Sequence, residues 1–161
     1  MPEDIIVSSG ITSTGLELVA ASASMGVSSG GTAYDTTIGC SGVLRVYNGG
    51  VANSTTVSDA GVLTVFSGGM AENTTLNSGG RLNLNNGGIL NETIVNESGQ
   101  LSIFGDSVTS TTLNSGGRMY VYSNAAASVR PSLPVRKSFT HSDELFSNSS
   151  LFSISHGWSL R

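Results

Sequence analysis

The sequence predicts an all-β fold: a parallel β-helix (β-solenoid) of about seven short coils, followed by an irregular C-terminal tail. Three observations predict it: a fixed repeat period, apolar residues at alternating positions, and glycine pairs between them. Thr36, Thr55, Thr74 and Thr93 are evenly spaced at the period of the repeat, and Thr111 comes one residue earlier than that period requires. A fixed period of this size is typical of proteins whose repeats bury apolar side chains against similar neighbours.

The apolar residues recur at fixed positions of each unit, counted from its first threonine. The ninth and eleventh positions alternate with variable ones, as in Leu82-Asn83-Leu84, and a period of two predicts a strand with one buried face. The columns are Val19, Ile38, Val57, Leu76, Val95 and Leu113 at the third position; Met25, Leu44, Leu63, Leu82, Leu101 and Met119 at the ninth; Val27, Val46, Val65, Leu84, Ile103 and Val121 at the eleventh; and Ala33, Ala52, Ala71, Leu90, Val108 and Ala127 at the seventeenth.

Glycine pairs, such as Gly49-Gly50 and Gly79-Gly80, flank the predicted strands. Glycine accepts the positive φ that tight corners require, and it recurs too often here for a helix. Each unit therefore contains a short strand around its ninth to eleventh positions and a second strand that runs into the threonines. We expect each strand to pair in parallel with its equivalent one coil away, so that coils about 4.8 Å apart form a rod about 30 Å long.

The repeat divides the chain into two predicted parts. Residues 1–129 are expected to form the solenoid, with residues 1–35 as a degenerate first portion, because terminal repeats cap the stack. Residues 130–161 contain no glycine pair, but they hold two of the three prolines and both histidines. We expect them to form a separate non-repeat tail that is either a cap or disordered.

Composition and charge exclude several functions. Residues 1–129 carry three arginines against nine acidic residues, a net charge of −6, which predicts no nucleic-acid partner because nucleic acids bind basic surfaces. The single cysteine, Cys40, cannot form an internal disulfide, and we expect it to be a surface thiol. No apolar run is long enough for a membrane helix, and the acidic N-terminus does not have the pattern of a signal peptide.

The unit pattern T-T-V-x-x-G-G-x-L-x-V-x-x-G-G-x-A-x-x, over about residues 5–129, resembles the 19-residue repeat of self-associating autotransporter adhesins of the AIDA type. The resemblance implies a surface-displayed β-helical passenger that works in adhesion to host cells, autoaggregation and biofilm formation. The implied partners are a second copy of the chain, glycans or proteins of host or bacterial surfaces, and a glycosyltransferase that adds heptose to serines and threonines. Without a signal peptide or a translocator barrel, the chain resembles a passenger fragment.

Two threonine columns stand at the first and second positions of the units. Adjacent residues of a strand face opposite ways, and the third position is apolar and inward, so the second column is expected to be exposed. Its members are the candidate O-glycosylation sites, and they are Thr37, Thr56, Thr75 and Thr112. The structural alternative is that threonine is simply favoured on strands, with stacked hydroxyls hydrogen-bonding along the ladder. A flat threonine row also resembles ice-binding solenoids, although Ile94 interrupts it.

Catalysis has little support in the sequence, and we expect a protein that is not an enzyme and has no cofactor or metal site. The acidic residues occupy non-equivalent positions of the repeat, whereas polysaccharide-cleaving β-helices need clustered carboxylates. His141, Asp143 and Glu144 lie together in the tail, where a chance Ser-His-Asp combination is expected among so many serines. Two alternatives stay open: a β-helical protein that binds or cleaves polysaccharides, and a truncated fragment without function.

Overall fold

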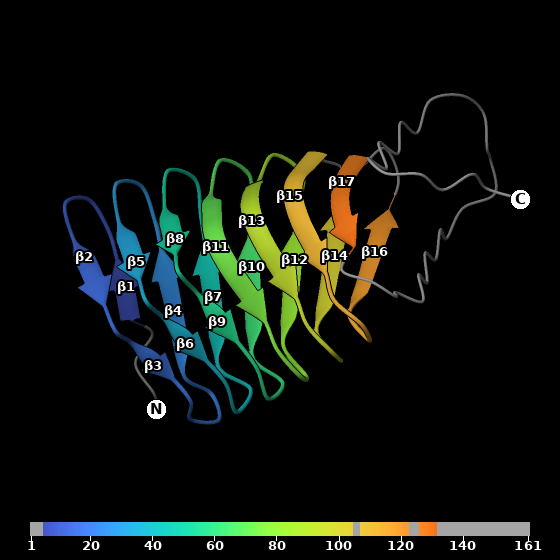
Figure 1. Ribbon diagram of the computed structural model, residues 1–161. Helices are drawn as coiled ribbons and strands as arrows, with labels where there is room; N and C mark the ends of the chain where they lie inside the picture. The colour runs from blue at the N-terminus through green and yellow to red at the C-terminus, as the bar shows by residue number, and fades with distance from the viewer. Residues whose placement is uncertain (1–4, 105–106, 123–125, 132–161) are drawn as a thin grey trace, which may run out of the picture.

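The computed structural model describes residues 5–104, 107–122 and 126–131, and every regular element in these ranges is a β-strand (Figure 1). The strands are short because each spans only one side of a coil. Their bounds are β1 Ile5–Val7, β2 Thr12–Thr14, β3 Glu17–Leu18, β4 Ser24–Val27, β5 Thr32–Tyr34, β6 Thr37–Ile38, β7 Val43–Val46, β8 Val51–Asn53, β9 Thr56–Val57, β10 Val62–Val65, β11 Met70–Leu76, β12 Arg81–Leu84, β13 Ile89–Val95, β14 Gln100–Phe104, β15 Ser107–Leu113, β16 Arg118–Tyr122 and β17 Ala126–Pro131.

The strands form two parallel sheets that stack along one axis. The first sheet has seven strands in the order β1-β4-β7-β10-β12-β14-β16, so six turns of the chain separate its first strand from its last. The second sheet has the order β17-β15-β13-β11-β8-β5-β2, with β3, β6 and β9 paired beside that path. Figure 1 shows the second sheet in front of the first, with equivalent strands side by side from the N-terminal end onward. The predicted parallel β-solenoid is confirmed.

The second sheet bends once in each coil. The residue at the nineteenth position has a positive φ, which is 57° at Ser54, 51° at Asn73 and 49° at Glu92. This bend interrupts the in-and-out alternation, because the seventeenth and first positions are both buried while the two residues between them are not. Before the bend the strand contributes its small inward residue, and after it the strand contributes an inward threonine and an inward aliphatic residue.

The core consists of the predicted columns. Leu44, Leu63, Leu82 and Leu101 are each paired with the next, one coil away, and all four are fully buried. Burying one such leucine contributes about 1.5–3 kcal/mol, so the ladders of equivalent side chains supply the main stabilisation of the rod.

One predicted core residue is wrong. Val19 was placed in the column of Ile38, but the partner of Ile38 is Leu18, which is 3% exposed, whereas Val19 is 43% exposed. The step from Leu18 to Ile38 is therefore one residue longer than the step from Met25 to Leu44, which has the regular length of the repeat. The extra residue is accommodated in the corner between Leu18 and Met25, where spacing is less constrained than in a paired strand.

The predicted short step of the repeat lies between Ile103 and Thr109, and a second short step lies in the pairing of β17 with β15, whose register shifts between Val108 and Thr111. Ile103 pairs with Leu84 at the regular step, whereas the step from Asn91 to its partner Thr109 is one residue shorter, so Val108 falls in the column of Leu90 as expected. The pairing of β17 with β15 continues to Pro131, two residues past the predicted boundary at residue 129. The division into a solenoid and a tail stays a prediction, since residues 132–161, with His141, Asp143 and Glu144, lie outside the described residues.

The two glycines of a corner have different tasks. The first, such as Gly68, has the positive φ that was expected, at 73°. The second, such as Gly69, has no positive φ, but a Cβ on it would lie 2.7 Å from the carbonyl oxygen of Val46 in the preceding coil. Gly61 is similar, because its Cβ would lie 2.5 Å from the carbonyl oxygen of Ile38. Close stacking of the coils therefore excludes a side chain at the second glycine.

The first-position threonines form an inner threonine row of Thr36, Thr55, Thr74, Thr93 and Thr111. All five are buried, and none of their Oγ1 atoms has a hydrogen-bond partner. The expectation that stacked hydroxyls bond along the ladder is wrong for this row. Equivalent atoms of neighbouring coils lie about 4.8 Å apart, which exceeds the reach of an O–H···O hydrogen bond by about 2 Å.

Candidate functional site

The predicted glycosylation sites form one outward row on the second sheet. Thr37 and Thr56 stand in β6 and β9, and Thr75 and Thr112 stand in β11 and β15. Their registers are direct: Thr37 pairs with Thr56, Thr56 with Thr75, and Thr75 with Ile94, which pairs with Thr112. All four threonines are half-buried, in contrast to the buried inner threonine row. The column therefore faces away from the core, although its threonines are half-buried and not exposed as expected, and both the sites and their modification stay predictions.

The outer threonine row passes over a shallow depression of about 440 Å³. Ile94 interrupts the row there and is 41% exposed, so an apolar side chain lies between two hydroxyls. Glu92, in the adjoining bend, adds a carboxylate to the rim. The lining residues are Asn73, Thr75, Glu92, Thr93, Ile94, Ser110 and Thr112.

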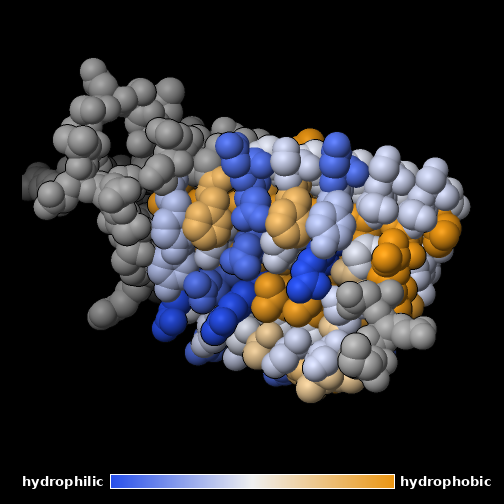
Figure 2. Space-filling view, turned by 180° about the vertical axis from the view of Figure 1, so that it is seen from behind, coloured by the Kyte–Doolittle hydropathy of each residue, from blue (hydrophilic) through white to orange (hydrophobic). Residues whose placement is uncertain are grey.

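The outer side of the first sheet carries side chains of a different kind, and we call it the aromatic face. Figure 2 shows this side of the solenoid, where hydrophobic patches alternate with hydrophilic side chains. Five of the six aromatic residues in the described part of the chain lie there, and the sixth, Tyr34, stands in β5 of the second sheet. The five are Tyr47, Phe66, Phe104, Tyr120 and Tyr122.

Four of these aromatic rings form two stacked pairs. The rings of Tyr47 and Phe66 have centroids 5.1 Å apart and planes within 7°, and those of Phe104 and Tyr122 are 4.4 Å apart and within 5°. Asn85 occupies the equivalent position in the coil between the two pairs. The stacking follows from the fold, because the coil rise of about 4.8 Å matches the separation that aromatic rings prefer.

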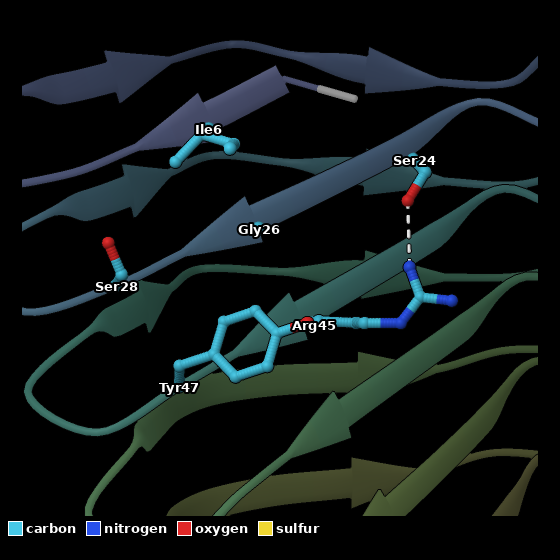
Figure 3. Close-up of a pocket in the computed structure, with 6 residues that line it drawn as sticks. All are labelled: Ile6, Ser24, Gly26, Ser28, Arg45 and Tyr47. Atoms are coloured by element: carbon cyan, nitrogen blue, oxygen red, sulfur yellow. Dashed lines mark hydrogen bonds between the residues drawn. The ribbon is translucent and has the colours of Figure 1, made fainter. Parts of the chain in front are cut away.

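A hollow of about 330 Å³ lies at the N-terminal part of the aromatic face (Figure 3). It forms over Gly26, whose neighbours in register are Ile6 in β1 and Arg45 in β7. Arg45 donates a hydrogen bond from Nη1 to Oγ of Ser24 at 2.8 Å. The lining residues are Ile6, Ser24, Gly26, Ser28, Arg45 and Tyr47.

Charge is segregated between the two sides of the rod. Arg45, Arg81 and Arg118 all stand on the aromatic face, in β7, β12 and β16. The acidic residues of the described part lie in the second sheet or at corners, and they are Glu17, Asp35, Asp59, Glu72, Glu92 and Glu97. The acidic solenoid therefore has one side whose described charges are all positive.

Polar ladders were also missed by the sequence analysis. Asn96 donates from Nδ2 to Oδ1 of Asn77 at 2.8 Å, and Asn114 donates from Nδ2 to Oδ1 of Asn96 at 2.6 Å. The ladder could have been predicted from the sequence, because these asparagines occupy the fourth position of successive units and therefore stack one coil apart. Glu72 accepts hydrogen bonds from Asn53 at 3.1 Å and from Asn91 at 3.5 Å, one coil on either side.

Other kinds of site find no support in the described residues. Among them, no group of three or more histidine, cysteine or acidic side chains is placed to hold a metal ion. No helix in the same ranges has the length and apolar character to span a membrane. Cys40 is an exposed free thiol at a corner.

Comparisons with known proteins bear on the whole arrangement. Residues 48–99 match the family model described as adhesin of bacterial autotransporter system, probable stalk. No curated protein matches the chain. A TibC-catalysed, hyper-glycosylated fragment of TibA has a similar solved structure, with a TM-score of 0.74 and 32% identity over 77% of this chain. The chain spans 45% of the length of that fragment. The resemblance of the repeats to those of autotransporter adhesins is confirmed, through the family match over residues 48–99 and the similar solved structure.

Proposed function

We propose that this chain is a stalk segment of an adhesin passenger: a non-catalytic repeat scaffold, displayed on a bacterial cell surface, that carries O-linked sugars on its outer threonine row. It would act in adhesion, autoaggregation and biofilm formation. The observation that carries the proposal is the outward row Thr37, Thr56, Thr75 and Thr112 on a solenoid whose solved neighbour is hyper-glycosylated.

The geometry of the row suits repeated modification by one enzyme. Successive coils present hydroxyls in the same backbone conformation about 4.8 Å apart, so a transferase that accepts one of them meets the same local structure at the next. A rod that repeats one surface also gains avidity from many weak contacts, which a single site would not provide.

Co-expression of the full chain with TibC tests the sugar sites, with intact-mass spectrometry as the readout. We expect mass additions on the wild type and fewer on the variant with valine at Thr37, Thr56, Thr75 and Thr112. A matched control places valine at four buried threonines of the inner row, Thr36, Thr55, Thr74 and Thr111, and should keep the additions. Equal additions on the outer-row variant and the wild type would overturn the assignment of these sites.

Self-association is proposed from the ends of the sheets. Among the described strands, β1 ends the first sheet and β2 ends the second, so each presents one backbone edge. Such an edge can pair with a strand of another copy. Light scattering after size exclusion should therefore show concentration-dependent species larger than a monomer, and a strict monomer at all concentrations would count against this part of the proposal.

The non-catalytic role has its own tests. Incubating the chain with polysaccharides should release no new reducing ends, and their release would favour the alternative of a polysaccharide-cleaving β-helix. Beads coated with the chain should retain cultured epithelial cells better than beads coated with albumin. A chain without cooperative unfolding would favour the alternative of a fragment without function.

A further inference from the structure

The aromatic face combines three features that the stalk role does not require: a hollow, exposed aromatic rings and an excess of arginine. We propose that this face binds a carboxylate-bearing glycan, such as a chain of uronic acid units, and that the hollow over Gly26 holds one sugar ring. The inference rests on the proposed adhesive role and deepens it by naming a ligand class. It is tested on the purified unmodified chain, so it can fail while the adhesive role stands.

The hollow is an open depression with the volume of a small ligand site. Its volume of about 330 Å³ lies at the lower end of the range for pockets that bind small molecules. Gly26 forms its floor, and the side chains on either side of it, Ile6 and Arg45, rise above that floor (Figure 3). A Cβ at Gly26 would lie 3.3 Å from Cε2 of Tyr47, so the tyrosine ring lies directly beside the glycine.

The lining groups match the two chemical parts of a pyranose ring, which are its apolar C–H face and its hydroxyl groups. One side of such a ring presents C–H groups, which pack against aromatic carbon, and Tyr47 offers a ring that is 41% exposed. Its stacking on Phe66 fixes the plane of that ring. The hydroxyls of Ser24 and Ser28 stand at the rim and can exchange hydrogen bonds with sugar hydroxyls.

Arg45 gives the hollow its preference for a carboxylate. The guanidinium has five N–H donors in a planar fork, and the bond from Nη1 to Ser24 at 2.8 Å uses one of them. That bond also restrains the side chain, so less conformational entropy is lost when the fork meets a ligand. Arginine–carboxylate pairs are frequently bidentate, and they are stronger than hydrogen bonds between neutral groups.

The rest of the face favours an extended acidic chain. Arg81 and Arg118 stand farther along the axis on the same side, and the outward positions of β4, β7, β10, β12, β14 and β16 contain no carboxylate. A linear polyanion with one sugar in the hollow would contact Arg45 there, and its following sugars would contact Arg81 and Arg118 farther along the axis. Several weak contacts on one chain raise the overall affinity through the effective concentration of the later ones.

A glycan fits this face better than a second copy of the protein. The outward side of the second sheet in a neighbouring rod holds mostly threonine, serine and asparagine, together with larger side chains such as Met70, Ile89 and Glu72, in columns that repeat along the rod. The hollow does not repeat in this way, because it lies over the single glycine of β4. A single sugar ring is small enough to enter a hollow of about 330 Å³ at one coil. Positive charge on the face and carboxylates on the ligand supply the complementarity.

The test uses oligomers of polygalacturonate as the probe and measures binding to the full purified chain by calorimetry. The matched neutral probe is the same oligomer with its carboxyl groups reduced to alcohols. We expect the acidic form to bind at least about ten times more tightly, with an affinity that falls as salt is raised, since exposed charges are screened. Equal binding of the two probes, or no binding of the acidic one, would overturn the proposal.

Four variants locate the site. Arg45→Gln removes the cation and should weaken binding at least about tenfold, while Gly26→Val fills the hollow with a strand-favouring side chain and should do the same. Arg118→Gln, at the far end of the face, should change the affinity less than about threefold. Tyr34→Ala, an aromatic change on the other sheet, should leave it unchanged.

If Gly26→Val does not fold, as judged by circular dichroism, Arg45→Gln alone still decides the question. Wild-type affinity in Arg45→Gln would show that the hollow is not the site. Loss of a dimer in Arg45→Gln, without any glycan binding by the wild type, would assign the face to a second copy and would also overturn the proposal.

Discussion

The inner threonine row gives the sharpest test of the packing. Thr74 is fully buried, its Oγ1 has no hydrogen-bond partner, and equivalent threonines lie in the coils on both sides of it. Valine has nearly the shape of threonine and the same branching at Cβ, so Thr74→Val exchanges a buried hydroxyl for a methyl group without changing the backbone. We expect this substitution to stabilise the protein.

The magnitude follows from what is removed and what is added. A buried hydroxyl without a partner costs about 1–3 kcal/mol of desolvation, which the valine does not incur. The new methyl group adds up to about 0.8 kcal/mol of apolar burial. An increase of about 2 kcal/mol in the free energy of unfolding is therefore expected, which is large beside a typical total of about 5–15 kcal/mol. The triple change at Thr55, Thr74 and Thr93 should exceed the single change, although neighbours in contact need not add.

Urea unfolding followed by the strand signal in circular dichroism measures the effect. With a slope of about 2 kcal/mol per molar urea, a gain of about 2 kcal/mol moves the midpoint up by about 1 M without changing the slope. Thr75→Val, one residue away in the outer threonine row, should change stability by less than about 0.5 kcal/mol. Thr74→Ser keeps the hydroxyl and loses the methyl group, so it should destabilise. A lower midpoint for Thr74→Val would refute the reasoning, since it would mean that the hydroxyl is bonded.

Three further predictions concern the corners, the polar ladder and the tail. Gly69→Ala should lower the free energy of unfolding by about 1–3 kcal/mol in urea, because the new Cβ would lie too close to the carbonyl oxygen of Val46. The control is Gly39→Ala, which should be close to neutral because the nearest atom to its new Cβ is 3.6 Å away. Asn96→Ala removes two ladder hydrogen bonds and should lower the melting temperature by the equivalent of about 1–3 kcal/mol, and an unchanged melting temperature would contradict the ladder. Removal of residues 132–161 should leave the urea midpoint unchanged if the tail is a separate part, and a large drop would show that the tail supports the solenoid.

Stacking explains why so much of the fold could be predicted from the sequence. Each inward position must hold a side chain that packs on its own equivalent one coil away, so Leu44, Leu63 and Leu82 repeat almost without change. The repeat is therefore visible without any knowledge of the structure. The length of a corner is less constrained than the register of a paired strand. An extra residue between Leu18 and Met25 therefore shifted the predicted column by one residue, to Val19.

The threonine row, the glycine contacts and the aromatic face depend on how atoms of neighbouring coils are placed relative to one another. The pattern of residue types along the repeat does not show this placement. Hydrogen bonds between stacked threonine hydroxyls were the structural alternative, but the expected rise of about 4.8 Å between coils already exceeds the reach of an O–H···O hydrogen bond. The second glycine of each corner was read as a second φ requirement, but for Gly69 the reason is the carbonyl of Val46. The aromatic face was missed because Tyr47 and Phe66 follow the core residues Val46 and Val65 at a position that the repeat does not keep constant, as Asn85 shows.

The two proposals use different sides of the same rod, and this separation is a consequence of the repeat. The outer threonine row belongs to the second sheet, whereas the hollow over Gly26 belongs to the first, and each side repeats along the axis without crossing to the other. Sugars on Thr56 or Thr75 therefore leave the hollow uncovered. The chain modified by TibC should bind polygalacturonate with the affinity of the unmodified chain. A loss of binding on modification would mean that the two sides are not independent, and it would place the sugars, or the glycan, on a surface that both share.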